Sequence, residues 1–236
     1  YGARDYQCMF LMGCLAALQS EEIGAGSKLG FTAPQPEASI IRSINAFSLG
    51  AKYINADATV QVVWVNSWYD PATETECANS LIASGIKVMG IGVDSPAIPQ
   101  TCEASGAYCT GYSFDMKEYA PDAVISSMVW NWGPLFKDVF ERYAQTGEVW
   151  GEYILFGQDK GCPQISPINT DIVSSDIADR IYEIQDKIIS GEIEVLQGEI
   201  KDNQGNVRVS AGEIMSDENM RDMGFLVENV IGSLPE

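Results

Sequence analysis

Strand-like and helix-like segments alternate along most of this chain, and this order limits the folds that the chain can adopt. Runs of β-branched and aromatic residues predict buried strands, and apolar residues at helical spacing predict the helices between them. We expect strands at 29–33, 60–66, 87–93, 107–112, 123–129 and 153–156, helices at 6–19, 36–55, 70–84, 95–106, 133–147, 174–189 and 218–231, and a hairpin at 202–205. Short connections between such elements predict an α/β fold with a mostly parallel sheet that helices cover on both faces.

Four of the predicted strands end in segments that carry aromatic, acidic or hydroxyl side chains. These segments are 66–70, 93–95, 112–115 and 130–132. Ligands of open parallel sheets bind beside the carboxyl ends of the strands. The pattern therefore predicts a ligand site at this edge of the sheet.

The charge balance and the absence of histidine exclude several classes of function. The chain carries 33 acidic and 14 basic residues, a net charge of −19, and no histidine. Such an acidic surface repels phosphate backbones, so we expect no nucleic-acid partner. The sequence has no histidine to act as a general base or metal ligand, and it contains no nucleophile elbow, phosphate loop or dinucleotide fingerprint. We expect no catalysis, no cofactor and no metal.

Cysteine usage points to an oxidising compartment. The even number of six cysteines suits one to three disulfides, with Cys102 and Cys109 as the first choice for a pair; six buried thiols are the alternative. No segment reaches the length needed to span a bilayer, and the apolar stretch 8–18 lacks the flanks of a signal peptide. Because we expect an extracytoplasmic protein, we also expect this sequence to begin inside a longer precursor.

Short motifs in a fixed order resemble the basic membrane lipoprotein (PnrA-like) family of ABC-transporter solute-binding proteins. The motifs lie at 63–74, 94–97, 111–116 and 126–133, with further matches at 10–13, 45–52 and 198–205. The resemblance implies a type I periplasmic-binding-protein fold, with two Rossmann-like lobes that close on a ligand. By this comparison, residues 1–57 form the remainder of an N-terminally incomplete first lobe, 58–190 the second lobe, and 191–236 a tail that returns toward the hinge. A lobe without its opening strands leaves open edges, so we expect a partner segment, an incomplete gene product or a processed chain.

The resemblance also implies the ligand, because studied members of the family deliver purine nucleosides to an ABC importer. Trp68 occupies the place of an aromatic residue that stacks on the base; a role in the core or hinge is the alternative. Three positions that hold the ribose in the family differ here and appear as Gln7, Ser113 and Trp130. The loss of these charged groups favours a free base such as adenine over a nucleoside.

Four more residues complete the predicted ligand site. Asp94 has a carboxylate that can accept from the N–H groups on the edge of a base, although it equally suits the start of the following helix. Asp115, Tyr112 and Asn131 are additional candidates near the strand ends. Two other functions stay open: a ligand-sensing receptor ectodomain, and a degenerate structural subunit that binds no ligand.

Overall fold

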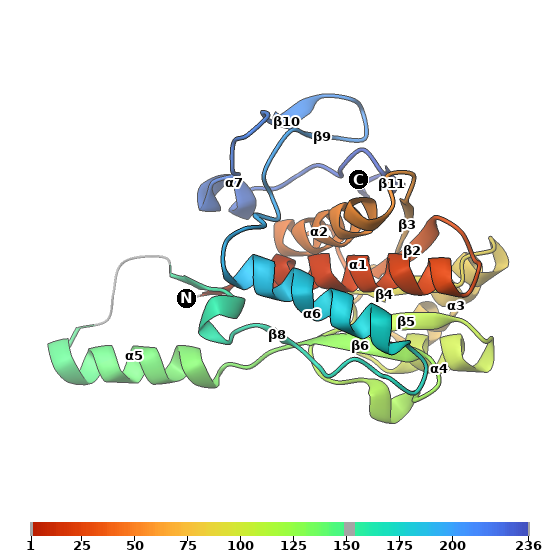
Figure 1. The fold of residues 1–236 in the computed structure, drawn as a ribbon, viewed down its shortest axis with the longest axis horizontal. Helices are drawn as coiled ribbons and strands as arrows, with labels where there is room; N and C mark the ends of the chain where they lie inside the picture. The colour runs from red at the N-terminus through yellow and green to blue at the C-terminus, as the bar shows by residue number, and fades with distance from the viewer. Residues whose placement is uncertain (1, 149–153, 236) are drawn as a thin grey trace.

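The computed structural model describes residues 2–148 and 154–235, which build a seven-stranded sheet between two layers of helices (Figure 1). The strand order is β11-β3-β2-β4-β5-β6-β8, and all neighbours are parallel except β6 and β8. The strands are β2 (Lys28–Ala33), β3 (Thr59–Trp64), β4 (Val88–Ile91), β5 (Tyr108–Gly111), β6 (Val124–Val129), β8 (Gln164–Ile165) and β11 (Val230–Ile231). The predicted α/β class with a mostly parallel sheet is therefore confirmed.

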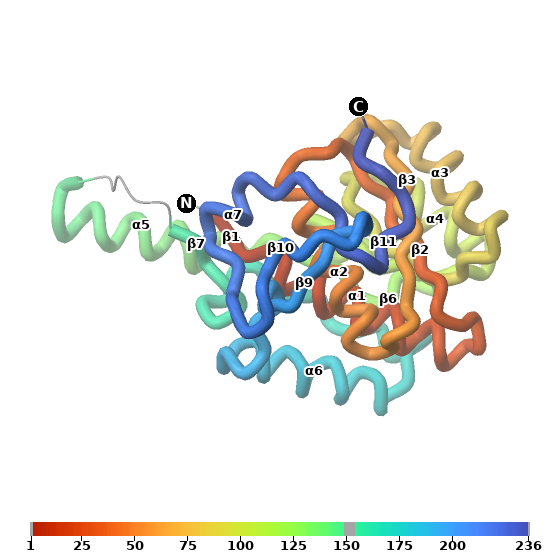
Figure 2. Tube along the Cα trace, turned by 90° about the horizontal axis from the view of Figure 1, so that it is seen from above, coloured from red at the N-terminus to blue at the C-terminus, as the bar shows by residue number. Residues whose placement is uncertain are grey.

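Helices cover both faces of this sheet, as predicted (Figures 1 and 2). The α-helices of the described residues are α1 (Asp5–Glu22), α2 (Ala38–Ile54), α3 (Pro71–Ala83), α4 (Ala97–Ala104), α5 (Gly133–Thr146), α6 (Ser175–Ile189) and α7 (Asp217–Arg221). Helices α1, α2 and α6 pack together on one face, and α3 and α4 pack on the other. A local sequence signal explains the start of α3: Asp70 caps this helix by accepting from the Thr73 amide at 3.2 Å, with Pro71 in the first turn.

Helices α1 and α2 approach each other closely because each carries a glycine at their contact. A Cβ atom on Gly13 would lie 1.9 Å from the Phe47 carbonyl oxygen, and one on Gly50 would lie 2.0 Å from the Phe10 carbonyl oxygen. The Cys14 thiol donates to the Gly50 carbonyl oxygen at 3.3 Å. This contact fixes α1 against α2 and therefore fixes the position of the N-terminal end of α1.

The first βαβ unit extends across the lobe boundary that we placed at residue 57. Strand β2 lies between β3 and β4 in the sheet, and α2 connects β2 to its neighbour β3. Residues 28–57 therefore belong to the same sheet as the segment that follows them. The boundary at residue 190 stays a prediction.

A small second unit lies beside this main body. Strands β1 (Gly2–Ala3) and β7 (Leu155–Phe156) form a separate parallel pair, and α5 projects away from the sheet next to them (Figures 1 and 2). A second hydrophobic cluster holds these elements together; its buried members are Ala3, Leu135, Phe156 and Cys162. The predicted strand at 153–156 is present as β7, although Tyr153 lies outside the described residues.

The predicted helix at 218–231 is wrong for most of its length, because tertiary hydrogen bonds compete for its backbone groups. Helix α7 ends at Arg221, and the chain continues into β11. The Asn45 side chain on α2 donates to the Phe225 carbonyl oxygen at 2.8 Å and accepts from the Val227 amide at 2.9 Å. These bonds hold the segment in an extended path along α2.

The expected disulfides are also absent, since all six cysteines are free and buried in the described part of the chain. Cys102 at the end of α4 lies next to Cys109 on β5. A side-chain hydrogen bond with Cys102 that favours the neutral thiol, together with burial, raises the pKa of Cys109 well above its usual range. Buried thiols of this kind contribute to the core as small apolar groups.

The tail hairpin is present and depends on one carboxylate. Strands β9 (Ile200–Lys201) and β10 (Val207–Val209) pair in antiparallel fashion, and Asp202 accepts from the Gln204 and Asn206 amides and from the Arg208 guanidinium. Burial alone would raise the pKa of Asp202, but hydrogen bonds from Asn206, Arg208 and Gln204 lower it to about 2.

We expect the hairpin to stay folded at pH 5 and to lose this stabilisation as the pH falls from about 4 toward 2. The sign follows because the folded pKa lies below the usual value of about 3.9, so that protonation favours the unfolded hairpin. Hydrogen exchange of the Asn206 amide between pH 5 and 2 measures the effect. An Asp202→Asn variant should show none of this pH dependence, and an unchanged acid transition in that variant would contradict the assignment.

Candidate functional site

A continuous row of hydrogen bonds joins four loops at the carboxyl edge of the sheet. The Asp94 amide donates to the Trp68 carbonyl oxygen at 3.1 Å, and the Ser113 hydroxyl donates to Asp94 Oδ1 at 3.0 Å. The Trp130 amide donates to the Ser113 carbonyl oxygen at 3.3 Å. These four residues follow β3, β4, β5 and β6 in turn. The structure thus brings together four of the eight residues that the sequence predicted for the ligand site.

Two of these loops contain a residue other than glycine in the left-handed backbone region. The φ angle is 59° at Asn66 and 69° at Ser113. Such conformations cost free energy and cluster at binding and active sites. Both lie at strand ends, and the one at Ser113 allows its hydroxyl and its carbonyl oxygen to bond to two different neighbouring loops.

Tyr112, a fifth predicted residue, is buried between charged groups of the same edge. Burial raises the pKa of its hydroxyl well above the usual range, Asp5 and Asp94 raise it further, and Arg42 lowers it. The phenol therefore stays protonated and can donate a hydrogen bond at any physiological pH. The Tyr112 ring meets the Trp130 ring edge to face, with centroids 6.4 Å apart.

Aromatic rings form the rim of this edge. The Trp130 ring stacks on Trp132 with centroids 4.9 Å apart and an interplanar angle of 13°. Trp68 is half-buried and packs against the main core, while Trp132 is more exposed. Flat aromatic surfaces of this kind suit a flat aromatic ligand, which they bind by stacking.

The other three predicted residues have local structural partners. Gln7 Oε1 accepts from the Gln158 amide at 2.9 Å, and Asn131 donates to the Gly161 carbonyl oxygen at 2.9 Å. Asp115 is exposed and accepts from the Lys117 amide at 3.0 Å, which closes a turn. The structure does not bring these side chains into the hydrogen-bonded row.

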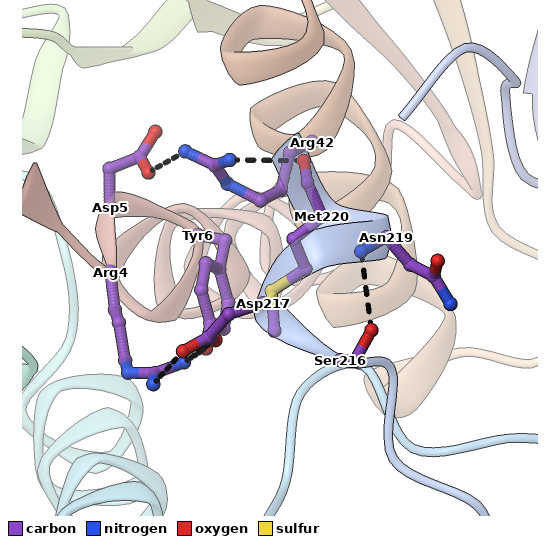
Figure 3. Close-up of polar contacts among 8 residues, drawn as sticks. All are labelled: Arg4, Asp5, Tyr6, Arg42, Ser216, Asp217, Asn219 and Met220. Atoms are coloured by element: carbon purple, nitrogen blue, oxygen red, sulfur yellow. Dashed lines mark hydrogen bonds and ion pairs between the residues drawn. The ribbon is translucent and has the colours of Figure 1, made fainter. Parts of the chain in front are cut away.

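A buried ion pair behind Tyr112 was not predicted from the sequence. Asp5 in the first turn of α1 accepts from Arg42 at 2.8 Å (Figure 3). It also accepts from the Ser43 hydroxyl at 2.7 Å, so both carboxylate oxygens are bonded. Arg42 also donates to the Met220 carbonyl oxygen at 3.3 Å, which joins α2 to the tail helix α7. The only sequence signal was an acid directly before the predicted helix at 6–19, and the comparison with the family directed attention to Gln7 instead.

A cavity of about 540 Å³ lies next to this ion pair, between the start of α1, the end of α6 and the tail. Arg4 donates to Tyr6 at 2.7 Å and forms two hydrogen bonds with Asp217, at 2.9 and 3.1 Å, on one wall of this cavity (Figure 3). Of the predicted site residues, only Gln7 lines this cavity. The cavity and the hydrogen-bonded row are therefore two different places on the molecule.

Two further properties of the described residues concern metal ions and membranes. Within residues 2–148 and 154–235, no three acids or cysteines gather closely enough to hold a metal ion. In the same ranges, no helix has both the length and the apolar character needed to cross a membrane. The described edge offers hydrogen-bond partners and aromatic surfaces, which are the elements of a binding site.

Comparison with known proteins places the chain in a family of solute-binding proteins. A solved structure of an ABC transporter solute-binding protein from Aeropyrum pernix K1 superimposes with a TM-score of 0.64 at 15% identity, covering 92% of this chain and 66% of that chain. A family model described as "ABC transporter substrate-binding protein PnrA-like" matches residues 3–199. The chain belongs to this family of ABC-transporter substrate-binding proteins.

Two curated relatives carry names that specify a ligand. The "Purine-binding protein BAB2_0673" of Brucella abortus is 32% identical over 237 residues, which cover 100% of this chain and 65% of that protein. The "Putative ABC transporter glucose-binding protein TsgA13" of Haloferax volcanii is 31% identical over 185 residues, which cover 77% of this chain and 45% of that protein. The chain thus spans less than two thirds of the length of either relative.

Proposed function

We propose that this protein captures a purine, with a free base such as adenine favoured over a nucleoside, and delivers it to an ABC importer. The observation that carries the proposal is the hydrogen-bonded row from Trp68 through Asp94 and Ser113 to Trp130, at the edge where parallel sheets bind ligands. The name of the Brucella relative supports the purine class.

In the proposed complex, the base stacks on Trp68 and donates an N–H group to Asp94. Asp94 is half-buried, and one of its carboxylate oxygens is bonded to Ser113. Stacking on an aromatic ring contributes about 1 kcal/mol beyond the burial of area, and a hydrogen bond to a charged group contributes about 1.5–3 kcal/mol. Together these contacts favour a flat ligand with N–H donors on its edge.

The preference for a free base rests on three residues that suit a ribose poorly. Gln7 and Ser113 are uncharged, and both side chains are already bonded within the protein. Trp130 stacks on Trp132 and brings a large apolar ring to the end of β6. None of the three offers the ionised partner that sugar hydroxyls bind most strongly.

A monosaccharide is the second candidate ligand, because the name of the Haloferax relative specifies glucose. Sugars also bind by stacking an apolar face on a tryptophan, while carboxylates accept from their hydroxyl groups. The two candidates differ in the ring that the site binds, so a single panel of ligands separates them.

We further propose that the protein acts outside the cytoplasm and that a partner segment covers its small second unit. Helix α5 exposes Phe136, Phe140 and Tyr143 on one face, with 54%, 70% and 54% of each residue accessible. Strands β1 and β7 beside it form an isolated parallel pair, and parallel sheets are ordinarily covered on both faces. A strand and a helix added here would pair with that sheet and bury the exposed aromatic rings.

Native mass spectrometry of the protein from its own cells tests for such a segment. Additional polypeptide, either continuous with these residues or bound to them, supports the proposal. A particle that consists of residues 1–236 alone contradicts it.

A thermal-shift screen tests the proposed ligand class. The panel contains adenine, guanine, hypoxanthine, adenosine, inosine and glucose. A ligand at a hundred times its dissociation constant stabilises the fold by about 2.7 kcal/mol, which is readily measured. We expect the largest shift with a free base; a shift with nucleosides alone would overturn the preference, and a shift with glucose alone would overturn the purine class.

A further inference from the structure

Ser113 bonds to both neighbouring loops of the site through a backbone conformation that serine rarely adopts. Its φ angle is 69°, its hydroxyl donates to Asp94 Oδ1 at 3.0 Å, and its carbonyl oxygen accepts from the Trp130 amide at 3.3 Å. The left-handed region favours glycine, which would provide the same backbone without the hydroxyl. A serine here therefore adds one thing that glycine lacks, a donor directed at the Asp94 carboxylate.

This donor makes the two oxygens of Asp94 unequal. Oδ1 is bonded to Ser113, whereas no hydrogen bond to Oδ2 is found from residues 2–148 or 154–235. The Asp94 amide is itself held by the Trp68 carbonyl oxygen, so the backbone and the carboxylate of this residue are both fixed. One oxygen of the carboxylate is thus left for a ligand.

We propose that Ser113 is a positioning residue that makes Asp94 selective for a ligand edge with a single N–H donor group. This inference rests on the proposed purine function and deepens it. Guanine presents two adjacent donors, N1–H and the exocyclic amine, which pair best with both oxygens of a carboxylate. Adenine presents its exocyclic amine next to a ring acceptor, and one oxygen is sufficient to bind it.

The test compares the affinities of adenine and guanine by calorimetry in the wild-type protein and two variants. We expect wild-type protein to bind adenine about tenfold more tightly than guanine, the lower range for one hydrogen bond to a charged group. Ser113→Gly keeps the backbone conformation and frees Oδ1, so the ratio should fall toward one through a gain in guanine affinity. Asn66→Gly removes the backbone strain at the other positive φ angle without changing a contact of Asp94. The adenine-to-guanine affinity ratio of this variant should match that of the wild type.

The outcomes separate this inference from the proposed function. If wild-type protein binds adenine and Ser113→Gly leaves the ratio unchanged, the inference is overturned while the purine function stands. A wild-type preference for guanine, or an equal change of the ratio in Asn66→Gly, overturns it as well. If the wild type binds neither base, the inference is overturned, and the other purines of the thermal-shift panel then decide whether the purine class stands. The melting temperature of each variant, measured without ligand, verifies that it is folded.

Discussion

Replacing Asp5 with alanine is expected to lower the free energy of unfolding by about 3–5 kcal/mol. Asp5 is 3% exposed, and both of its carboxylate oxygens are bonded, one to Arg42 and one to Ser43. Removing one partner of a buried ion pair costs much more than the net contribution of the pair, because the remaining charge loses its counter-charge. In this variant, the Arg42 guanidinium would stay buried but would no longer be paired with the Asp5 carboxylate.

An exposed ion pair nearby provides the matched control. Arg4 and Asp217 also form two hydrogen bonds, but the Asp217 side chain is 43% exposed. Pairs of this kind contribute about 0–1 kcal/mol, so Asp217→Ala should have a small effect. Urea denaturation of both variants measures the difference. Equal losses in the two variants would contradict the structural importance of the Asp5 pair.

Replacing Gly13 with alanine is expected to lower the free energy of unfolding by about 3 kcal/mol, because overpacking at this contact meets backbone rather than flexible side chains. The added Cβ would lie 1.9 Å from the Phe47 carbonyl oxygen and 2.7 Å from its carbonyl carbon. Neither atom can move without a shift of the whole of α2. The two helices would have to separate, and with them Asp5 and Arg42, which stand on α1 and α2 respectively.

Gly133→Ala is the control for the effect of alanine itself in a helix. Gly133 begins α5, and the atom nearest to an added Cβ is Asn131 Oδ1 at 3.7 Å. We expect a change within about 0.5 kcal/mol for this variant. A Gly13→Ala variant that is as stable as Gly133→Ala would show that α1 and α2 pack less closely than described.

The order of the elements could be predicted because local signals set it. Asp70 followed by Pro71 starts α3 through contacts within one turn, and the runs of β-branched residues in β3 and β6 suit buried strands in any fold of this class. The tail could not be predicted in the same way. Its path after Arg221 depends on Asn45, which lies far away in the sequence and supplies the hydrogen bonds that a helix would otherwise make internally.

Sheet topology made part of the candidate site predictable. The part that depends on which side of helix α1 faces its neighbours could not be predicted. Trp68, Asp94, Ser113 and Trp130 come together because the carboxyl ends of parallel strands share one edge. The orientation of helix α1 could not be predicted in this way. Of its 18 residues 15 are buried, so no polar stripe in the sequence marks a solvent-facing side. The sequence therefore did not indicate that Asp5 rather than Gln7 lies between α1 and α2.

Calorimetric titration of adenine into wild-type protein and into Trp68→Ala tests the proposed purine site most directly. We expect saturable binding of one adenine to the wild-type protein. Loss of the stacking ring and of its buried area should weaken binding at least tenfold, which corresponds to about 1.4 kcal/mol. Unchanged affinity in Trp68→Ala, with the variant still folded, would contradict a site at this edge of the sheet.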